Sequence, residues 1–146
     1  MKTSDIEDRE RLLKLEELIL ELQELSDSGA IIVVEGRKDL RSLRLLGIKG
    51  EIRLASQQPL LEFTDLLSTS KKEIILLTDW DNKGGLMARK ILQHLSNYGI
   101  LPNTAIRSKL RSLSKKSIKD VESLNNYISR LRYEVMEYRN ENIYCL

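Results

Sequence analysis

Short apolar runs alternate with amphipathic segments along the middle of the chain. Continuous apolar runs of this length are typical of strands that are buried on both faces of a parallel sheet. Apolar residues at helical spacing between them predict the connecting helices, and Pro59 stands at the favoured first position of one of them. The expected strands cover residues 30–35, 51–55 and 73–79, and the expected helices cover 38–46, 59–67 and 85–97.

The two ends of the chain carry longer helical patterns. Leucines repeat every three or four residues over 4–25, and apolar residues recur at the same spacing over 117–139. We expect both helices to pack on the sheet. A coiled-coil seam in a homodimer is the alternative for the first helix, although its repeat is short for that structure.

Residues 104–113 alternate apolar or small side chains with basic ones. A period of two predicts a strand with one basic face, near an edge of the sheet. This would make about four parallel strands, flanked by helices on both faces, in an α/β fold. We therefore expect one domain over residues 1–146, with a core at 30–113 and the two terminal helices packed on it.

Composition narrows the setting and the chemistry. Charged residues make up 32% of the 146 residues, but the net charge is only +2. The single cysteine, Cys145, favours a reducing environment, and the charged start and the lack of a long apolar run predict a cytoplasmic protein without membrane contact. One cysteine and one histidine, His94, cannot build the usual zinc sites, and His94 has no nucleophile motif nearby. Carboxylates are plentiful, and they suit Mg²⁺ or Mn²⁺.

Three of these carboxylates follow the two most apolar strands. Glu35 ends the first strand, and Asp79 and Asp81 end the third. Chemistry in open parallel sheets occurs beyond the carboxyl ends of the strands, so we expect these side chains to converge if the strands are neighbours. Such a cluster repels itself unless a divalent ion relieves the repulsion. Solvated turn carboxylates that cap the next helix are the alternative for the two aspartates.

The sequence Val33-Val34-Glu35-Gly36, followed by Asp79-Trp80-Asp81-Asn82-Lys83-Gly84, resembles the Toprim domain over roughly residues 30–113. That domain is shared by topoisomerases, bacterial-type primases, recombination-repair proteins and nucleases that mature ribosomal RNA. The overall size is similar to that of the stand-alone small Toprim proteins of archaea. The resemblance implies a compact Rossmann-like sheet, with Glu35 as the acid/base that also touches metal. It also implies that Asp79 and Asp81 hold one or two Mg²⁺ ions.

Basic residues extend this site toward a nucleic acid, either RNA or DNA. Arg37 and Lys38 start a helix, where cations are disfavoured unless a phosphate binds, and Lys83 lies in the aspartate turn. Residues 107–119 hold six cations and no acid, which is enough for several phosphate contacts. A solvated face is the alternative for each set. The cations of the predicted strand are Arg107, Lys109 and Arg111.

These features favour a Mg²⁺-dependent protein that cleaves phosphodiester bonds in RNA or DNA. A non-catalytic module that binds metal and nucleic acid in RNA processing or DNA replication and repair is the alternative. The chain is not expected to be a topoisomerase or a primase, because it lacks their additional domains. A phosphoacceptor receiver domain would have an acidic pair after the first strand, and a dinucleotide-binding domain would have a glycine fingerprint there. Trp80 is expected to pack or to stack on a base, and Asp120 to cap a helix or join the acids.

Overall fold

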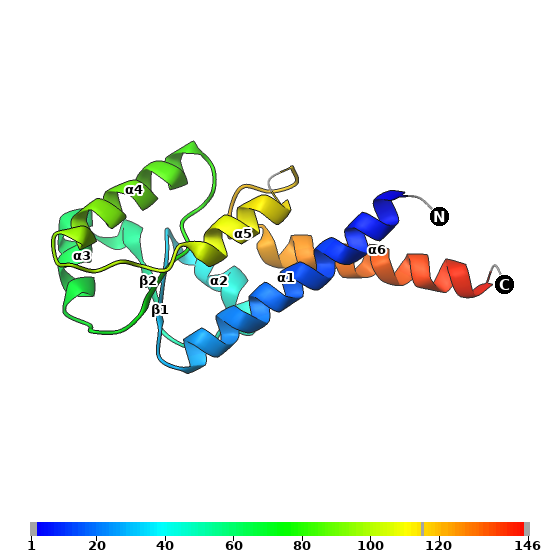
Figure 1. The fold of residues 1–146 in the computed structure, drawn as a ribbon, viewed down its shortest axis with the longest axis horizontal. Coiled ribbons are helices and arrows are strands. Elements are labelled where there is room, and N and C mark those ends of the chain that lie inside the picture. Colours follow the sequence, from blue (N-terminus) through cyan, green and yellow to red (C-terminus); the bar gives the residue numbers. More distant parts are fainter. Residues whose placement is uncertain (1–2, 115, 145–146) are drawn as a thin grey trace.

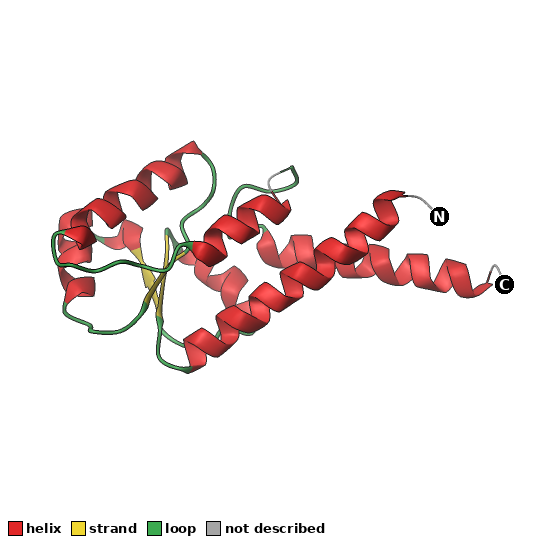
Figure 2. Cartoon of the chain, in the orientation of Figure 1, coloured by secondary structure: helices red, strands yellow, loops and turns green. Residues whose placement is uncertain are grey.

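The computed structural model describes residues 3–114 and 116–144 and places a parallel sheet between two groups of helices (Figure 1, Figure 2). Lys115 and Cys145 lie outside the described residues. The sheet has the order β2-β1-β3, with the strands β1 (Ile31–Val34), β2 (Ile52–Leu54) and β3 (Ile74–Leu76). The most apolar run, β1, therefore lies at the centre, as expected for a strand that is buried on both sides.

The helices and one 3₁₀ turn surround this sheet. They are α1 (Thr3–Asp27), α2 (Arg37–Leu45), η1 (Ala55–Gln57), α3 (Leu60–Ser68), α4 (Asn82–Ser96), α5 (Ala105–Ser114) and α6 (Leu124–Tyr144). Helices α3 and α4 lie together on the left in Figure 1, and α1, α5 and α6 lie on the right. The expected α/β class, with helices on both faces of a parallel sheet, is confirmed.

Two apolar cores follow from the alternation of side chains along the strands. Ile31 and Val33 point into the core formed with α3 and α4. Ile32 and Val34 point into the larger core, which also contains apolar side chains of α1, α2, α5 and α6. All four side chains are fully buried. The sheet is thus held by burial on both faces, and its carboxyl edge is left for polar residues.

The first and last helices form a pair that extends away from the sheet (Figure 1). Leu15 and Leu22 of α1 are fully buried, as is Ile128 of α6, and all three belong to the larger core. An ion pair joins Arg132 Nε to Glu16 at 2.8 Å across the two helices. The pair brings the two ends of the chain to the same side of the molecule.

The prediction of a fourth strand at 104–113 is wrong, since α5 occupies this segment. Within the residues that the structure describes, a single isolated parallel bridge, between Ile75 and Asn103, marks the fourth position of the sheet. The Asn103 side chain then accepts a 2.9 Å hydrogen bond from the Ala105 amide and turns the chain into the helix. Ile106 and Leu110, four residues apart, are buried, so the apolar residues follow the helical period rather than a period of two.

The last helix begins seven residues later than predicted, at Leu124 rather than at residue 117. The backbone of the preceding segment makes other hydrogen bonds. The carbonyls of Ile118 and Lys119 accept hydrogen bonds from Trp80, and the Val121 amide donates to Asp79. Backbone groups that would have formed the first turns of a helix instead make hydrogen bonds to the residues that follow strand β3. We call residues 118–121 the docking loop.

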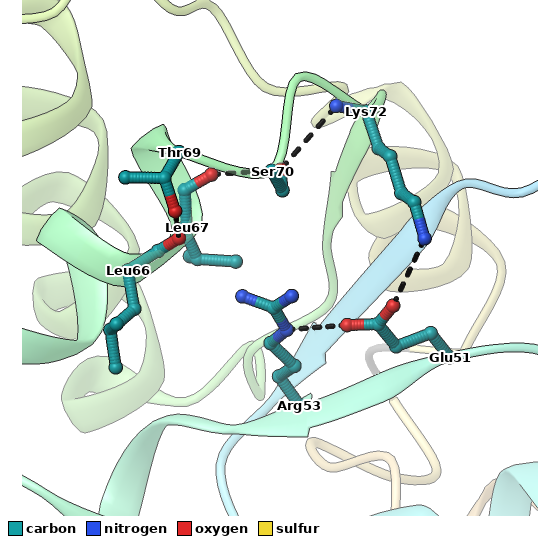
Figure 3. Close-up of polar contacts among 7 residues, drawn as sticks. All are labelled: Glu51, Arg53, Leu66, Leu67, Thr69, Ser70 and Lys72. Atoms are coloured by element: carbon teal, nitrogen blue, oxygen red, sulfur yellow. Dashed lines mark hydrogen bonds and ion pairs between the residues drawn. The ribbon is translucent and has the colours of Figure 1, made fainter.

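A separate charge cluster lies at the opposite end of the sheet, where strands begin (Figure 3). Glu51 accepts hydrogen bonds from Arg53 Nε at 2.5 Å and from Lys72 Nζ at 3.3 Å. Burial raises the pKa of Glu51, but the hydrogen bonds and charges of Arg53 and Lys72 outweigh it, so this pKa lies below its ordinary value. These charges are mutually satisfied, in contrast to those at the carboxyl edge.

Candidate functional site

The carboxyl ends of β1 and β3 are neighbours, and they bring two of the predicted acids together. Val33 pairs with Leu76, and the Leu77 amide donates a 2.8 Å hydrogen bond to the Val33 carbonyl just beyond the ladder. Glu35 follows the end of β1, and Asp79 follows this extension of β3. The two carboxyl groups are near enough for Asp79 to lower, and for Asp39 and Asp81 to raise, the pKa of Glu35.

Both carboxyl groups have raised pKa values. Burial is the largest cause for Glu35, hydrogen bonding to Asp79 lowers the value in part, and the charges of Asp39 and Asp81 raise it further. Burial also raises the pKa of Asp79, to about 7, against the lowering effect of the Val121 amide. The charges of Asp39, Glu35 and Asp120 add to this increase. The pair therefore favours holding a proton, or a cation, near neutral pH.

One oxygen of the pair has no partner in the protein. Glu35 Oε1 is buried, and within residues 3–114 and 116–144 no group donates a hydrogen bond to it. A buried oxygen without a donor is costly, and a bound cation or proton would satisfy it. The oxygen-only donors of this edge fit Mg²⁺ or Mn²⁺ in chemical character.

The third predicted ligand, Asp81, is placed differently. Its Oδ1 caps α4 by accepting a 2.6 Å hydrogen bond from the Gly84 amide, which is the capping role considered as the alternative. Its charge still raises the pKa of Glu35, so it lies within electrostatic range of the pair. Across the part of the chain that the structure describes, no three His, Cys, Asp or Glu side chains are arranged as a metal-binding group. Glu35 and Asp79 form the centre of the acidic edge, and Asp81 lies beside it.

Two further acids belong to this edge: Asp39, which the sequence analysis did not select, and Asp120, for which it left two roles open. Asp39, in the first turn of α2, is buried, and its Oδ2 accepts a 3.0 Å hydrogen bond from the Gly36 amide. Asp120 caps its own turn by accepting a 2.8 Å hydrogen bond from the Ser123 amide. Both charges raise the pKa of Asp79. An acid one helical turn after Glu35 was the available signal for Asp39.

The docking loop fixes Asp79 and Trp80. The indole Nε1 of Trp80 donates to the Ile118 carbonyl at 2.9 Å, and its backbone amide donates to the Lys119 carbonyl at 2.8 Å. The Val121 amide donates to Asp79 Oδ1, also at 2.9 Å. The Trp80 side chain is 6% exposed. Of its two expected roles, packing is therefore the one observed, and the ring is not free to stack on a base.

Arg107 holds the same strand end from the side of α5. Its Nε donates to the Thr78 carbonyl at 2.8 Å, and its Nη2 donates to the Asp79 carbonyl at 2.7 Å. Burial and the charge of Arg111 lower the pKa of Arg107, whereas the nearby acids raise it. Among the described residues, Arg107 is therefore the one predicted phosphate-binding cation that also donates hydrogen bonds to the backbone of the acidic edge.

The other predicted basic residues lie in three places. Arg111 lines a groove between α4 and α5 together with Arg107, and Arg89, which the sequence analysis did not select, joins them. Lys109 faces α1 in a separate depression. Arg37, Lys38 and Lys83 are exposed, and Lys38 Nζ lies 3.9 Å from a carboxylate oxygen of Glu122.

Comparison with known proteins identifies the family. The Toprim domain matches residues 30–113, which contain Glu35, Asp79 and Asp81. The chain belongs to the Toprim family. Membership indicates a metal-dependent function that acts on nucleic acid, since both properties are associated with this domain.

The relatives of this Toprim protein include small archaeal proteins. It is 47% identical to a UPF0292 protein of Methanosarcina acetivorans, over 85% of this chain and 86% of the relative. It is 36% identical to a UPF0292 protein of Methanocaldococcus jannaschii, over 83% and 92% of the two chains. A solved structure of an Aquifex aeolicus protein has a TM-score of 0.63 and 30% identity, over 73% of this chain and 94% of that one. Within residues 3–114 and 116–144, no helix combines the length and apolarity that a membrane crossing needs.

Proposed function

We propose that this Toprim protein cleaves phosphodiester bonds in RNA or DNA, with Glu35 as the acid/base. The observation that carries the proposal is the Glu35–Asp79 pair, in which two half-buried carboxyl groups share the end of neighbouring strands. Burial is the largest cause that raises both pKa values, and the charges of neighbouring acids add to it. A carboxyl group whose pKa approaches the working pH is suited to transferring a proton in catalysis.

Glu35 supports the proton transfer by its position. Its Oε1 is buried without a hydrogen-bond donor among the described residues, which favours the protonated form of this carboxyl group, the form that would give a proton to a leaving oxygen. General acid/base groups of this kind contribute roughly 10²–10⁴-fold to a rate. We assign this role to Glu35 rather than Asp79, because Asp79 is bound to the docking loop through Val121.

Asp79 and Glu35 would hold a divalent cation. Asp81 does not form a metal-binding group with them in the described structure, and it would become the third ligand by turning its side chain toward the ion. The Oδ1 of Asp81 caps α4, and its Oδ2 has no hydrogen bond in the described part of the chain, which leaves that oxygen for a ligand. Bound Mg²⁺ would supply Lewis acidity toward a phosphate oxygen. Glu35 and Asp79 would hold the ion at the ends of the two strands, and the raised pKa of Glu35 favours a proton on its carboxyl group.

A cleavage assay with metal titration tests the proposal. The purified full chain is incubated with structured RNA, single-stranded RNA and DNA, and duplex DNA, in Mg²⁺, Mn²⁺ or EDTA. We expect metal-dependent cleavage of at least one substrate, which Glu35→Gln lowers by about 10²–10⁴-fold. Asp79→Asn should weaken metal binding, measured by calorimetry. Glu134→Gln, an exposed carboxylate on α6, should behave as wild type.

The results separate the catalytic function from its alternative. Salt-dependent nucleic-acid binding with metal affinity, but no cleavage of any substrate, would replace the proposal with an accessory binding module. Cleavage that survives in Glu35→Gln and Asp79→Asn would contradict the assigned site. Wild-type protein that binds neither metal nor nucleic acid would contradict both functions.

A further inference from the structure

A groove of about 660 Å³ runs between α4 and α5 from the acidic edge. Its mouth contains Asp81 and Asn82, at the start of α4. Gly85, Arg89 and Leu92 line one wall at intervals of three or four residues, as the same face of a helix requires. The groove is thus continuous with the candidate site but lies outside the carboxylate cluster.

Three arginines face this groove, and in the described part of the chain the acid at its mouth, Asp81, forms a salt bridge with none of them. Arg107 and Arg111, one turn apart on α5, line one wall, and Arg89 lines the other. Among residues 3–114 and 116–144, none of the three forms an ion pair within 4.0 Å. Other cations of the protein do have such partners, for example Lys72 with Glu51. Unneutralised arginines on both walls of one groove favour a ligand with several negative charges.

Apolar surface lies beside these charges. Leu86 is 49% exposed and lines the groove, and so does Leu92. Gly85 has no side chain to occupy the groove beside Arg107. A Cβ added there would lie 3.9 Å from Arg107 Nη2. Adjacent apolar and cationic surfaces suit a ligand that alternates flat apolar groups with phosphates.

The size of the groove favours a single strand of nucleic acid over a duplex. Its volume lies in the range of small-molecule pockets, roughly 300–1,000 Å³, which is enough for a few groups of one strand. A duplex carries two strands on either side of a major groove about 12 Å wide, whereas this volume suits part of one strand. A single strand could enter with its backbone against both walls.

We propose that the α4–α5 groove binds a single-stranded polynucleotide and leads it to the acidic edge, with Arg89 and Arg111 contacting its phosphates. This inference rests on the proposed function, which it deepens by naming the form of the substrate. Arg107 supports the mouth of the groove through its bonds to the Thr78 and Asp79 carbonyls. Arg89 and Arg111 are exposed and are free to follow the strand.

Fluorescence anisotropy in EDTA tests the groove without any cleavage. The probes are ten-nucleotide oligo-uridine and oligo-thymidine strands and duplexes of RNA and DNA, each titrated at several salt concentrations. We expect either single strand to bind the full chain at least tenfold more tightly than the duplexes. Arg89→Gln and Arg111→Gln should each weaken this binding about three- to tenfold and reduce the salt slope by about 0.7.

Matched variants separate the groove from general surface charge. Lys90→Gln and Lys14→Gln remove exposed cations that do not line the groove, and they should leave single-strand binding unchanged. Gly85→Leu keeps every charge but fills the groove, and it should weaken binding to a similar extent as the arginine variants. Thermal melts of each variant establish that the fold is retained.

Several results would overturn the groove assignment. These are equal affinity for duplexes, equal losses in the Lys90→Gln and Lys14→Gln controls, or normal binding by both arginine variants. If cleavage is absent but the groove variants lose binding as expected, only the proposed catalysis fails. If cleavage depends on Glu35 while both arginine variants bind normally, only the groove assignment fails.

Discussion

Gly84 lies directly against the backbone of Asp79. A Cβ placed on Gly84 would stand 2.0 Å from the Asp79 carbonyl oxygen and 2.5 Å from its carbonyl carbon. The Gly84 amide is also the donor that Asp81 Oδ1 accepts, and the Gly84 carbonyl accepts a 2.9 Å hydrogen bond from Thr78 Oγ1. The backbone at the start of α4 therefore packs directly against the backbone that follows β3. This contact fixes the backbone positions of Asp79 and Asp81.

We predict opposite effects for alanine at two adjacent glycines. Gly84→Ala must move the backbone of Asp79, so it should destabilise the protein by about 2–4 kcal/mol. Gly85→Ala meets only the end of the Arg107 side chain at 3.9 Å, and it should stabilise α4 by up to about 1 kcal/mol. Urea unfolding of the two variants measures the difference. Equal stabilities would show that the strand end and the helix can separate freely.

We predict that stability falls as pH rises through the titration of Asp79. Its pKa is about 7 in the folded protein against an ordinary value of 3.8, so the folded state binds this proton more tightly than the unfolded state does. The stabilising effect of the proton is complete below pH 3.8 and is lost as pH rises to about 7. Because water screens the half-buried carboxylate, we expect a loss of about 1–2 kcal/mol rather than the full value of the shift.

Asp79→Asn tests this dependence, because its amide oxygen can still accept the Val121 hydrogen bond. The variant should be about 1–2 kcal/mol more stable than wild type at pH 8, and the gain should disappear near pH 4. Urea unfolding in EDTA at both pH values provides the measurement, with Glu134→Gln as the exposed control. A variant that is less stable than wild type at pH 8 would mean that the Asp79 charge is already compensated within the protein.

We predict that Trp80→Phe loosens the docking loop. The phenyl ring fills much of the same space but cannot donate to the Ile118 carbonyl, which should cost about 1–3 kcal/mol. Since the loop also supplies the Val121 amide to Asp79, affinity for Mg²⁺ should fall as well. Tyr98→Phe removes an exposed hydrogen bond to Asp65 and should change neither property. Loss of stability with unchanged metal affinity would limit Trp80 to packing.

We predict that Arg107→Lys weakens the strand end although the charge remains. A lysine cannot reach the Thr78 and Asp79 carbonyls with two fixed donors, and the lost hydrogen bond should cost about 1–2 kcal/mol. Arg111→Lys is the matched control, because Arg111 is exposed and donates no recorded hydrogen bond within the described residues. Denaturation and calorimetric Mg²⁺ binding distinguish the two variants. Equal behaviour would assign Arg107 only a role as a surface cation.

The sequence predicted the central elements well because their signals were redundant. The strands β1 and β3 lie within continuous apolar runs that are followed by acids, and no helical pattern competes with them. Residues 104–113 fit two periods at once, because Ile106 and Leu110 share a face in a strand and in a helix. The side chain of Asn103 favours the helix, because it accepts a hydrogen bond from the Ala105 amide. Residue propensities alone do not reveal that hydrogen bond.

The centre of the site was predictable for a geometric reason, and its surroundings were not. Residues that follow neighbouring parallel strands meet at one edge, so Glu35 and Asp79 could be paired from the sequence. Asp39 and the docking loop depend on how α2 and the segment before α6 pack over that edge. Residues 117–123 carry the signals of a helix start, but their backbone groups bind Trp80 and Asp79 instead.

The docking loop also determines how long a fragment must be to contain the complete site. The Toprim match ends at residue 113, whereas the backbone groups that hold Trp80 and Asp79 come from residues 118–121. A fragment trimmed to the match would carry Glu35, Asp79 and Asp81 yet lack the amide that holds Asp79. During synthesis from the N-terminus, Asp79 likewise emerges some forty residues before Val121. The acidic pair is therefore completed late, after the rest of its own sheet has been made.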